Sequence, residues 1–242
     1  MQSRQYENLY FQMPRKMVMV YGPGCVGLGK LLSIEMEASG QNYYHFLPQE
    51  KLAFSSAAGQ ETFLNKCYNP DKTQTSYLRF GILPLKWMHK YLFEKPSIIV
   101  WVIELGEGKT VEGFDQFRRV HSAIEAYVKK HKIRIVVILK SSQTRFEEDK
   151  SLFRSSFDMS NKQLFSSKRE NFDDVIKEVG AFIKTFSVKF YANKILKYKD
   201  NLTIGNGEHI RFQEYYLRNY IKISLFNLFT MERQKAGKYF EK

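Results

Sequence analysis

Ser97–Leu105 reads SIIVWVIEL, a run of β-branched and other apolar side chains that does not alternate with polar ones. Such a run is typical of a strand buried on both faces of a parallel sheet. A second run of this kind, IRIVVIL, follows at Ile133–Leu139. Between the two runs, apolar residues recur at helical spacing: Phe114, Phe117, Val120, Ile124, Tyr127 and Val128. Strand, helix and strand at this spacing predict a parallel crossover unit, which is right-handed almost without exception.

Three shorter strands and one helix extend this unit on either side. Met17–Tyr21 (MVMVY) predicts a strand that meets the breaker cluster GPG, and Val26–Ser39 then predicts a helix that ends at Gly40. A short strand at Tyr43–Leu47 is expected to close at Pro48, and Lys162–Ser166 predicts an edge strand. We therefore expect an α/β domain at residues 16–170: a mostly parallel open sheet of about five strands, flanked by helices.

The pattern becomes helical after residue 170. Asn171 can cap a helix that runs towards Tyr198, and a second helix is expected from about His209 to the end of the chain. Two long antiparallel helices of this kind predict a hairpin at residues 171–242 that begins an α-helical solenoid. We expect the chain to be a fragment, with an aromatic face at Phe212–Phe229 that is partly unpaired and promotes self-association.

Composition restricts the class of protein. The longest apolar stretch is too short for a membrane span, and two cysteines, Cys25 and Cys67, favour a reducing compartment such as the cytosol. Glu7–Met13 (ENLYFQM) matches the recognition site of a protease used to remove expression tags, so residues 1–15 are interpreted as a tail or a tag remnant.

Charge gives a weak indication of partners. The net charge of +13 divides into +7 before residue 166 and +6 from there on, as in a solvated lysine-rich surface. Lysines and aromatic residues are interleaved in Lys189–Lys199, but their helical phase separates an apolar core stripe from a charged flank. We therefore do not expect nucleic-acid binding.

A glycine-rich segment, GPGCVGLGKL at Gly22–Leu31, carries the strongest chemical motif. Gly24, Gly29 and Lys30 stand at the spacing of a phosphate-binding P-loop between a strand and a helix. Leu31 occupies the position at which the motif has a magnesium-binding hydroxyl, and the partner carboxylate would have to be Glu104. A backbone turn is therefore the favoured interpretation, and a P-loop-like nucleotide-binding protein is the alternative. The five histidines and two cysteines show no metal-ligand spacing, and we assign no catalytic residue and no cofactor.

One block, GILPLKWMHKYLFEKPSIIVWVIEL at Gly81–Leu105, resembles the N-terminal region of the foie gras family, subunit 11 of the trafficking protein particle (TRAPP) complex. The residues that carry the resemblance, in the family's order and spacing, are Gly81, Ile82, Leu83, Trp87, Met88, Lys90, Leu92, Pro96, Glu104 and Leu105. A more diffuse similarity extends over nearly everything after Lys16, including QLF at Gln163–Phe165, FYANKILKYK at Phe190–Lys199 and FNLFTMERQKAGKYFEK at Phe226–Lys242.

The resemblance implies a non-catalytic scaffold subunit of a vesicle-tethering complex that acts in endoplasmic reticulum-to-Golgi transport and in autophagy. In that family the whole complex promotes nucleotide exchange on a Rab-type GTPase, while this subunit supplies protein–protein contacts to the other subunits. The implied location is cytoplasmic and peripheral to Golgi and ER–Golgi membranes, with no transmembrane segment. The family's pattern has no P-loop at the position of Gly24–Leu31.

Overall fold

The computed structural model describes residues 14–41, 44–49, 83, 87, 91–92, 95–105, 110–141, 146–157, 163–167, 172–203 and 210–241. The expected tail at residues 1–15 lies outside these residues, apart from Pro14 and Arg15. The described residues form two compact units. One contains 17–49 and 98–184, and the other contains 14–16, 185–241 and the described part of 83–97.

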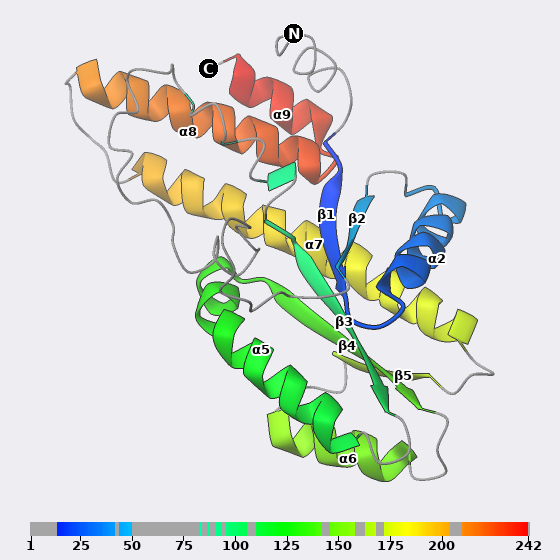
Figure 1. The fold of residues 1–242 in the computed structure, drawn as a ribbon. Helices are drawn as coiled ribbons and strands as arrows, with labels where there is room; N and C mark the ends of the chain where they lie inside the picture. The colour runs from blue at the N-terminus through cyan, green and yellow to red at the C-terminus, as the bar shows by residue number, and fades with distance from the viewer. Residues whose placement is uncertain are drawn as a thin grey trace, which may run out of the picture. The chain divides into compact units, whose positions relative to one another are not determined.

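The first unit is built on a five-stranded parallel sheet, as expected (Figure 1). The strand order is β2-β1-β3-β4-β5, so the chain starts in the interior of the sheet, moves to one edge, and then returns to build the other side. The strands are β1 (Lys16–Tyr21), β2 (Tyr44–Gln49), β3 (Ile98–Leu105), β4 (Arg134–Ser141) and β5 (Leu164–Ser167).

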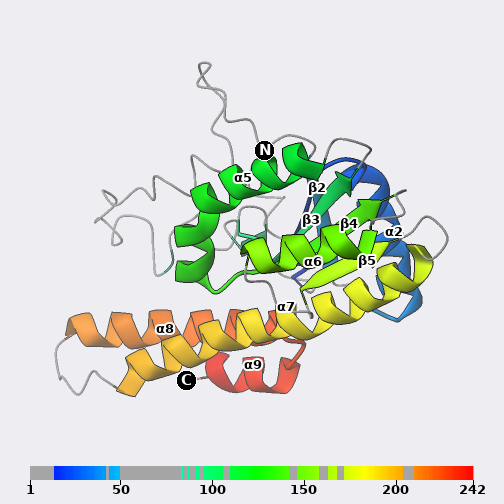
Figure 2. The same ribbon diagram turned by 90° about the horizontal axis from the view of Figure 1, so that it is seen from below.

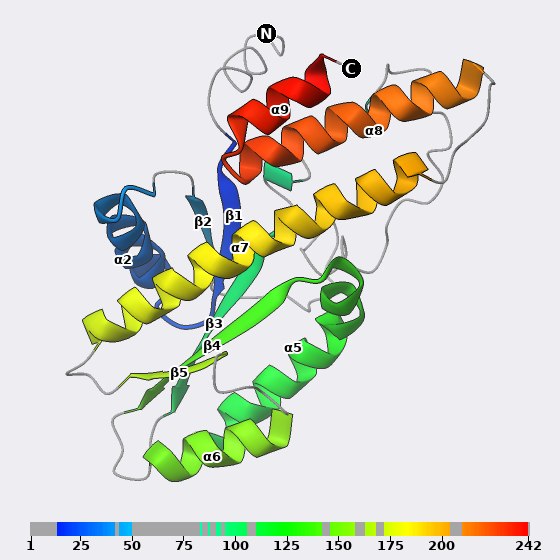
Figure 3. The ribbon, with the colours of Figure 1, turned by 180° about the vertical axis from the view of Figure 1, so that it is seen from behind.

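Helices cover both faces of this sheet. Helices α5 (Thr110–His131) and α6 (Phe146–Phe157) lie on one face, and α7 (Phe172–Thr203) begins on the other (Figure 2). Helix α2 (Cys25–Ala38) lies beside the beginning of α7, because a Cβ on Gly180 would stand 3.6 Å from the Met36 sulfur (Figure 3). Parallel crossovers are right-handed almost without exception. From β1 the chain first adds β2 on one side and later adds β3, β4 and β5 on the other, so the helices of these two sets of crossovers lie on opposite faces of the sheet.

The central strands are buried on both sides. Every residue of β1 is buried, and Ile98–Ile103 of β3 are at most 4% exposed. On the α5 face, the Trp101 ring centroid lies 4.8 Å from that of Tyr21 and 4.6 Å from that of Phe117. Phe117 in turn contacts an aromatic group formed by Phe114, Phe153 and Phe157. Burial of these rings holds α5 and α6 on the sheet.

One helix of this unit was not predicted, and one strand boundary was predicted wrongly. Helix α6 covers residues 146–157, for which the sequence analysis predicts no element. The spacing of Phe146, Phe153 and Phe157 indicates the helix, but the many charges between them conceal its narrow apolar face. Strand β2 does not close at Pro48 but continues through it to Gln49. It is an edge strand among the described residues, and an edge position tolerates proline because one side of the backbone needs no strand partner.

The second unit is helical. It contains the latter part of α7, α8 (Ile210–Phe229) and α9 (Arg233–Phe240). Helices α7 and α8 run antiparallel, because Tyr191 stacks on Phe229 with ring centroids 4.4 Å apart while Tyr198 stacks on Phe226. Phe226 and Phe229 are fully buried, so the unpaired part of the expected aromatic face does not include these two positions.

The expectation of one helix from His209 to the end of the chain is also wrong. Helix α8 ends at Phe229, where Met231 adopts a left-handed conformation with φ of 68°. The Met231 N–H donates to the Leu228 carbonyl at 3.1 Å, and the Glu232 N–H donates to the Asn227 carbonyl at 2.9 Å. This pair of bonds is the Schellman ending, usually marked by glycine, and here no glycine marks it in the sequence. Helix α9 then folds back on α8, where the Ser224 hydroxyl donates to the Ala236 carbonyl.

The sequence pattern changes from α/β to helical at residue 170, close to the start of α7. The boundary between the two compact units lies later, between Lys184 and Thr185 within that helix. The apolar stripe of α7 is continuous across this point, with Ile183 and Ser187 both fully buried. A helix with an uninterrupted stripe has no composition change that would reveal such a division.

Lys16 at the start of β1 is only 1% exposed, and burial lowers its pKa from 10.5 to about 8. Between pH 8 and pH 10 the unfolded chain keeps this proton while the folded chain loses it, so the unfolding free energy rises with pH. We expect Lys16→Met to reduce the increase in unfolding free energy between pH 8 and pH 10 by roughly 2 kcal/mol. Urea unfolding at several pH values in this range measures the increase.

Lys222, whose pKa is also lowered to about 8, supplies the remaining rise, so the variant should flatten the profile without abolishing its slope. An identical pH profile for the variant and the unchanged protein would contradict the prediction.

Candidate functional site

The carboxyl ends of β1 and β3 are the place where an open parallel sheet of this order binds ligands, because the chain leaves the two strands in opposite directions. The glycine-rich turn at Gly22–Gly24 occupies this place, between β1 and α2. The motif found in the sequence therefore lies where the topology predicts a site.

Gly22 is required by close packing. Its φ is +107°, and a Cβ at this position would overlap the backbone carbonyl oxygen of Val102 in β3. Only glycine combines this conformation with so close an approach between a turn and the neighbouring strand. The turn is thus explained by the backbone, as the favoured interpretation of the sequence held.

Gly24 is the N-cap of α2, with φ of 69° and no capping side-chain hydrogen bond. Helix α2 begins at the next residue, Cys25, and the Leu28 N–H already donates to the Gly24 carbonyl at 3.0 Å. In a P-loop, the residues between the first glycine and the lysine form an open loop whose N–H groups surround the phosphate. Here those residues are helical, so the phosphate-cradling loop is not formed.

The remaining residues of the motif face different surroundings. Gly29 is buried, and a Cβ on it would lie 3.8 Å from the Cβ of Phe46 in β2. Lys30 is exposed on α2, and the adjacent Leu31 is 40% exposed. The structure therefore does not bring Gly24, Gly29 and Lys30 together around one point.

A residue that the sequence analysis did not single out lies beside Gly24. The ammonium group of Lys140, near the end of β4, is 3.5 Å from where a Cβ on Gly24 would stand, and 5.0 Å from the ring centroid of Phe172. Glu104, the expected partner carboxylate, pairs with Lys140 in the strand register and is exposed. Lys140 directly follows the apolar run that ends at Leu139, and that position was the signal available in the sequence.

The chemistry of this edge is limited. A helix N-terminus beside an ammonium group favours an anion electrostatically. Among the residues that the structure describes, no group of three or more histidine, cysteine, aspartate or glutamate side chains could hold a metal ion. We assign no catalytic role to the edge.

The outer face of α2 is the most unusual surface of this unit. One side of the helix is buried on the sheet through Leu28, Leu32 and Met36. The opposite side is mixed: it exposes Val26 (44%), Leu31 (40%) and Ile34 (62%) beside the charged residues Lys30 and Glu37. We refer to Val26, Leu31 and Ile34 as the α2 outer face.

Comparison of the chain with models of known protein families and with curated protein sequences finds no match to either. The resemblance to the foie gras family therefore rests on the residues quoted for it.

The turn geometry predicts opposite effects for two glycines five residues apart. Gly22→Ala should destabilise the protein by about 3 kcal/mol, because of its positive φ and the overlap with the Val102 carbonyl. Gly27→Ala should stabilise it by about 0.5 to 1 kcal/mol, because a Cβ there meets nothing within 4 Å and alanine favours a helix. Thermal and urea unfolding measure both, and equal effects would contradict the described turn.

The helical conformation of Cys25–Leu28 also predicts that magnesium-dependent nucleotide binding through this motif fails. Calorimetric titration with magnesium and ATP should give no heat of binding, and Lys30→Ala should behave like the unchanged protein. Saturable binding that Lys30→Ala abolishes would restore the P-loop alternative.

Proposed function

We propose that this chain is a non-catalytic scaffold subunit of a TRAPP-type vesicle-tethering complex, a complex that promotes exchange on a Rab-type GTPase in endoplasmic reticulum-to-Golgi transport and autophagy. Its direct partners are the other subunits of the complex. The GTPase and the vesicle or Golgi membrane are reached through those subunits, which places the chain in the cytoplasm at the periphery of Golgi and ER–Golgi membranes.

Two independent lines support this proposal. The first is the resemblance of Gly81–Leu105, in which Trp87, Pro96 and Glu104 stand at the family's spacing. The second is the observation that carries the proposal, the α2 outer face, because an exposed apolar helix side is what a protein–protein interface uses. Leu31 and Ile34 are three residues apart and lie next to each other on α2, whereas Val26 lies farther round the helix.

The membrane relation in the proposal is indirect. None of the helices in the described ranges is both long and apolar enough to cross a bilayer. The alternative, a nucleotide-binding protein that uses the Gly22–Lys30 turn, has the topological position in its favour but lacks the loop conformation and the magnesium-binding hydroxyl.

The proposal predicts which surface binds the complex. We expect affinity capture of the tagged chain from cells to retain tethering-complex core subunits, identified by mass spectrometry after a moderate-salt wash. The double variant Leu31→Glu with Ile34→Glu should reduce their recovery about tenfold or more, because it places two charges in an apolar contact.

Leu152→Glu on α6 is the matched control, because Leu152 is 54% exposed and lies on the opposite face of the sheet. It should leave the recovery unchanged, and circular dichroism should show that both variants stay folded. Recovery of no tethering-complex subunit by the unchanged chain would remove the proposed function. Equal recovery by the α2 variant would remove the proposed surface.

A further inference from the structure

Helix α2 carries a narrow stripe of uncharged residues on the side that faces away from the sheet. Its members, at intervals of four, three and four residues, are Gly27, Leu31, Ile34 and Ala38. All four are exposed in the folded chain, and Ile34 is exposed to 62%. Alternating intervals of three and four residues place side chains along one line of a helix, as in the contact line of a coiled coil. We call this stripe the α2 seam.

The order of residue sizes in the α2 seam is the same from either end. Its two outer members, Gly27 and Ala38, are small, and its two inner members, Leu31 and Ile34, are large. When two identical helices run antiparallel, the first member of one seam faces the last member of the other. Gly27 then faces Ala38 of the second copy, and Leu31 faces Ile34. A Cβ on Gly27 would meet nothing within 4 Å, so the small ends leave room for two helices to approach closely.

Charges on one flank of the seam fit the same arrangement. Lys30 directly precedes Leu31, and Glu37 follows Ile34 by three residues, so both charges lie on one side of the seam. In an antiparallel helix pair, flanking residues of this kind face each other across the contact. Lys30 of each copy would therefore face Glu37 of the other.

Both charges are available for such a contact. In the part of the chain that the structure describes, neither Lys30 nor Glu37 belongs to an ion pair. Glu37 accepts a hydrogen bond from the Ser33 hydroxyl at 3.3 Å, within the same exposed stretch of α2. Both side chains are exposed, so a partner helix can reach them.

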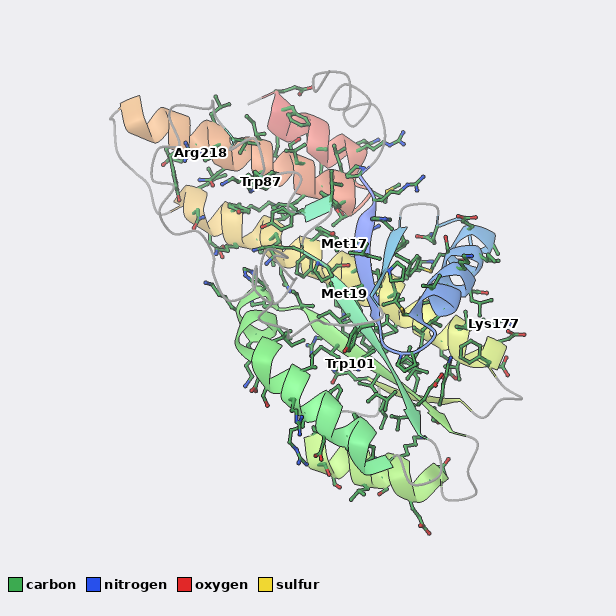
Figure 4. The ribbon with its side chains drawn as sticks, in the orientation of Figure 1. Met17, Met19, Trp87, Trp101, Lys177 and Arg218 are labelled. Carbon is green, nitrogen blue, oxygen red and sulfur yellow. The ribbon has the colours of Figure 1, made fainter. Side chains whose placement is uncertain are left out.

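The other flank of the seam lies against α7. A Cβ on Gly180 would stand 3.6 Å from Cγ of Glu35, and Figure 4 shows Lys177 on the same beginning of α7, next to α2. A second helix would therefore approach α2 over the seam and over the flank that carries Lys30 and Glu37.

We propose that two copies of the chain associate through an antiparallel contact between their α2 helices, with the α2 seam at its centre and Lys30 facing Glu37 at both ends. The occupant is a second copy because the residue sizes and the charges are both self-complementary, as a two-fold interface requires. One pair of helices of this length buries less than the ~1,200 Å² at which stable interfaces begin, so the dimer is weak and depends on concentration. The pairing does not rest on the proposed function, and other subunits would compete with the second copy for Leu31 and Ile34.

The first experiment measures the mass of the purified chain by equilibrium sedimentation at increasing concentration. We expect a reversible equilibrium between monomer and dimer. Ile34→Glu should raise the dissociation constant about tenfold or more, because it places a charge in the centre of the seam. A chain that stays monomeric at every concentration, or an Ile34→Glu variant that associates like the unchanged chain, would overturn the proposal.

Leu217→Glu on α8 is the matched control, because Leu217 is 40% exposed, as Leu31 is. It also lies in the segment whose aromatic face is expected from the sequence to promote self-association. It should associate like the unchanged chain, and circular dichroism should show that both variants stay folded. Loss of the dimer in Leu217→Glu alone would overturn the proposal in favour of an α8 contact.

The second experiment tests the antiparallel direction by exchanging charges. Lys30→Glu and Glu37→Lys should each weaken association about tenfold, because two like-charge contacts replace two opposite-charge contacts. An equal mixture of the two variants should associate about as tightly as the unchanged chain, and so should the double variant. Absence of this rescue would overturn the antiparallel pairing. The purified chain contains no other subunit, so failure of these tests is distinct from failure to capture tethering-complex subunits.

Discussion

Removal of both faces of a parallel sheet from water is the constraint on which the rest of the α/β unit depends. β1 and the central part of β3 have no exposed side chain, so a helix layer is needed on each face. Because the crossovers are right-handed, they place helices on both faces only if the chain adds strands first on one side of the starting strand and then on the other. This change of side occurs at β1, and the same change puts the Gly22 turn against Val102. The close approach at Gly22 is therefore a consequence of sheet burial and requires no ligand to explain it.

The helices meet this constraint in different ways. Helix α5 buries Phe117 and Ile124 and turns charged residues such as Arg118 and Lys129 to solvent, so its sequence contains one interface. Helix α2 buries Leu32 and still exposes Ile34 on its other side, so its sequence contains two. Under the proposed function, this exposed side of α2 is the surface that other subunits would contact.

The sheet could be predicted from the sequence because its signals are local: uninterrupted apolar runs for β3 and β4, and glycine at the turn after β1. The break between α8 and α9 could not, because Met231 takes the left-handed position without the glycine that usually marks it. Gly24, Gly29 and Lys30 had the right spacing, but spacing does not show that α2 begins at Cys25. The position of the Lys222 ammonium over the rings of Trp87 and Tyr198 could not be predicted either, because these residues come from three segments that only folding brings together.

Aromatic rings lie beneath the ammonium groups of several lysines, including Lys140 over Phe172, Lys194 over Phe190 and Lys199 over Tyr239. A ring attracts a cation through its quadrupole, which acts only at short range and carries no net charge. Each ammonium group is thus stabilised locally, while its full charge still contributes to the field outside the molecule. The chain keeps its net charge of +13, and within about one Debye length of its surface, ~8 Å at physiological salt, that field accelerates the approach of anionic partners. A lysine over a ring is thus stabilised by a short-range contact that salt screens only weakly, whereas the field of the net charge is screened over one Debye length.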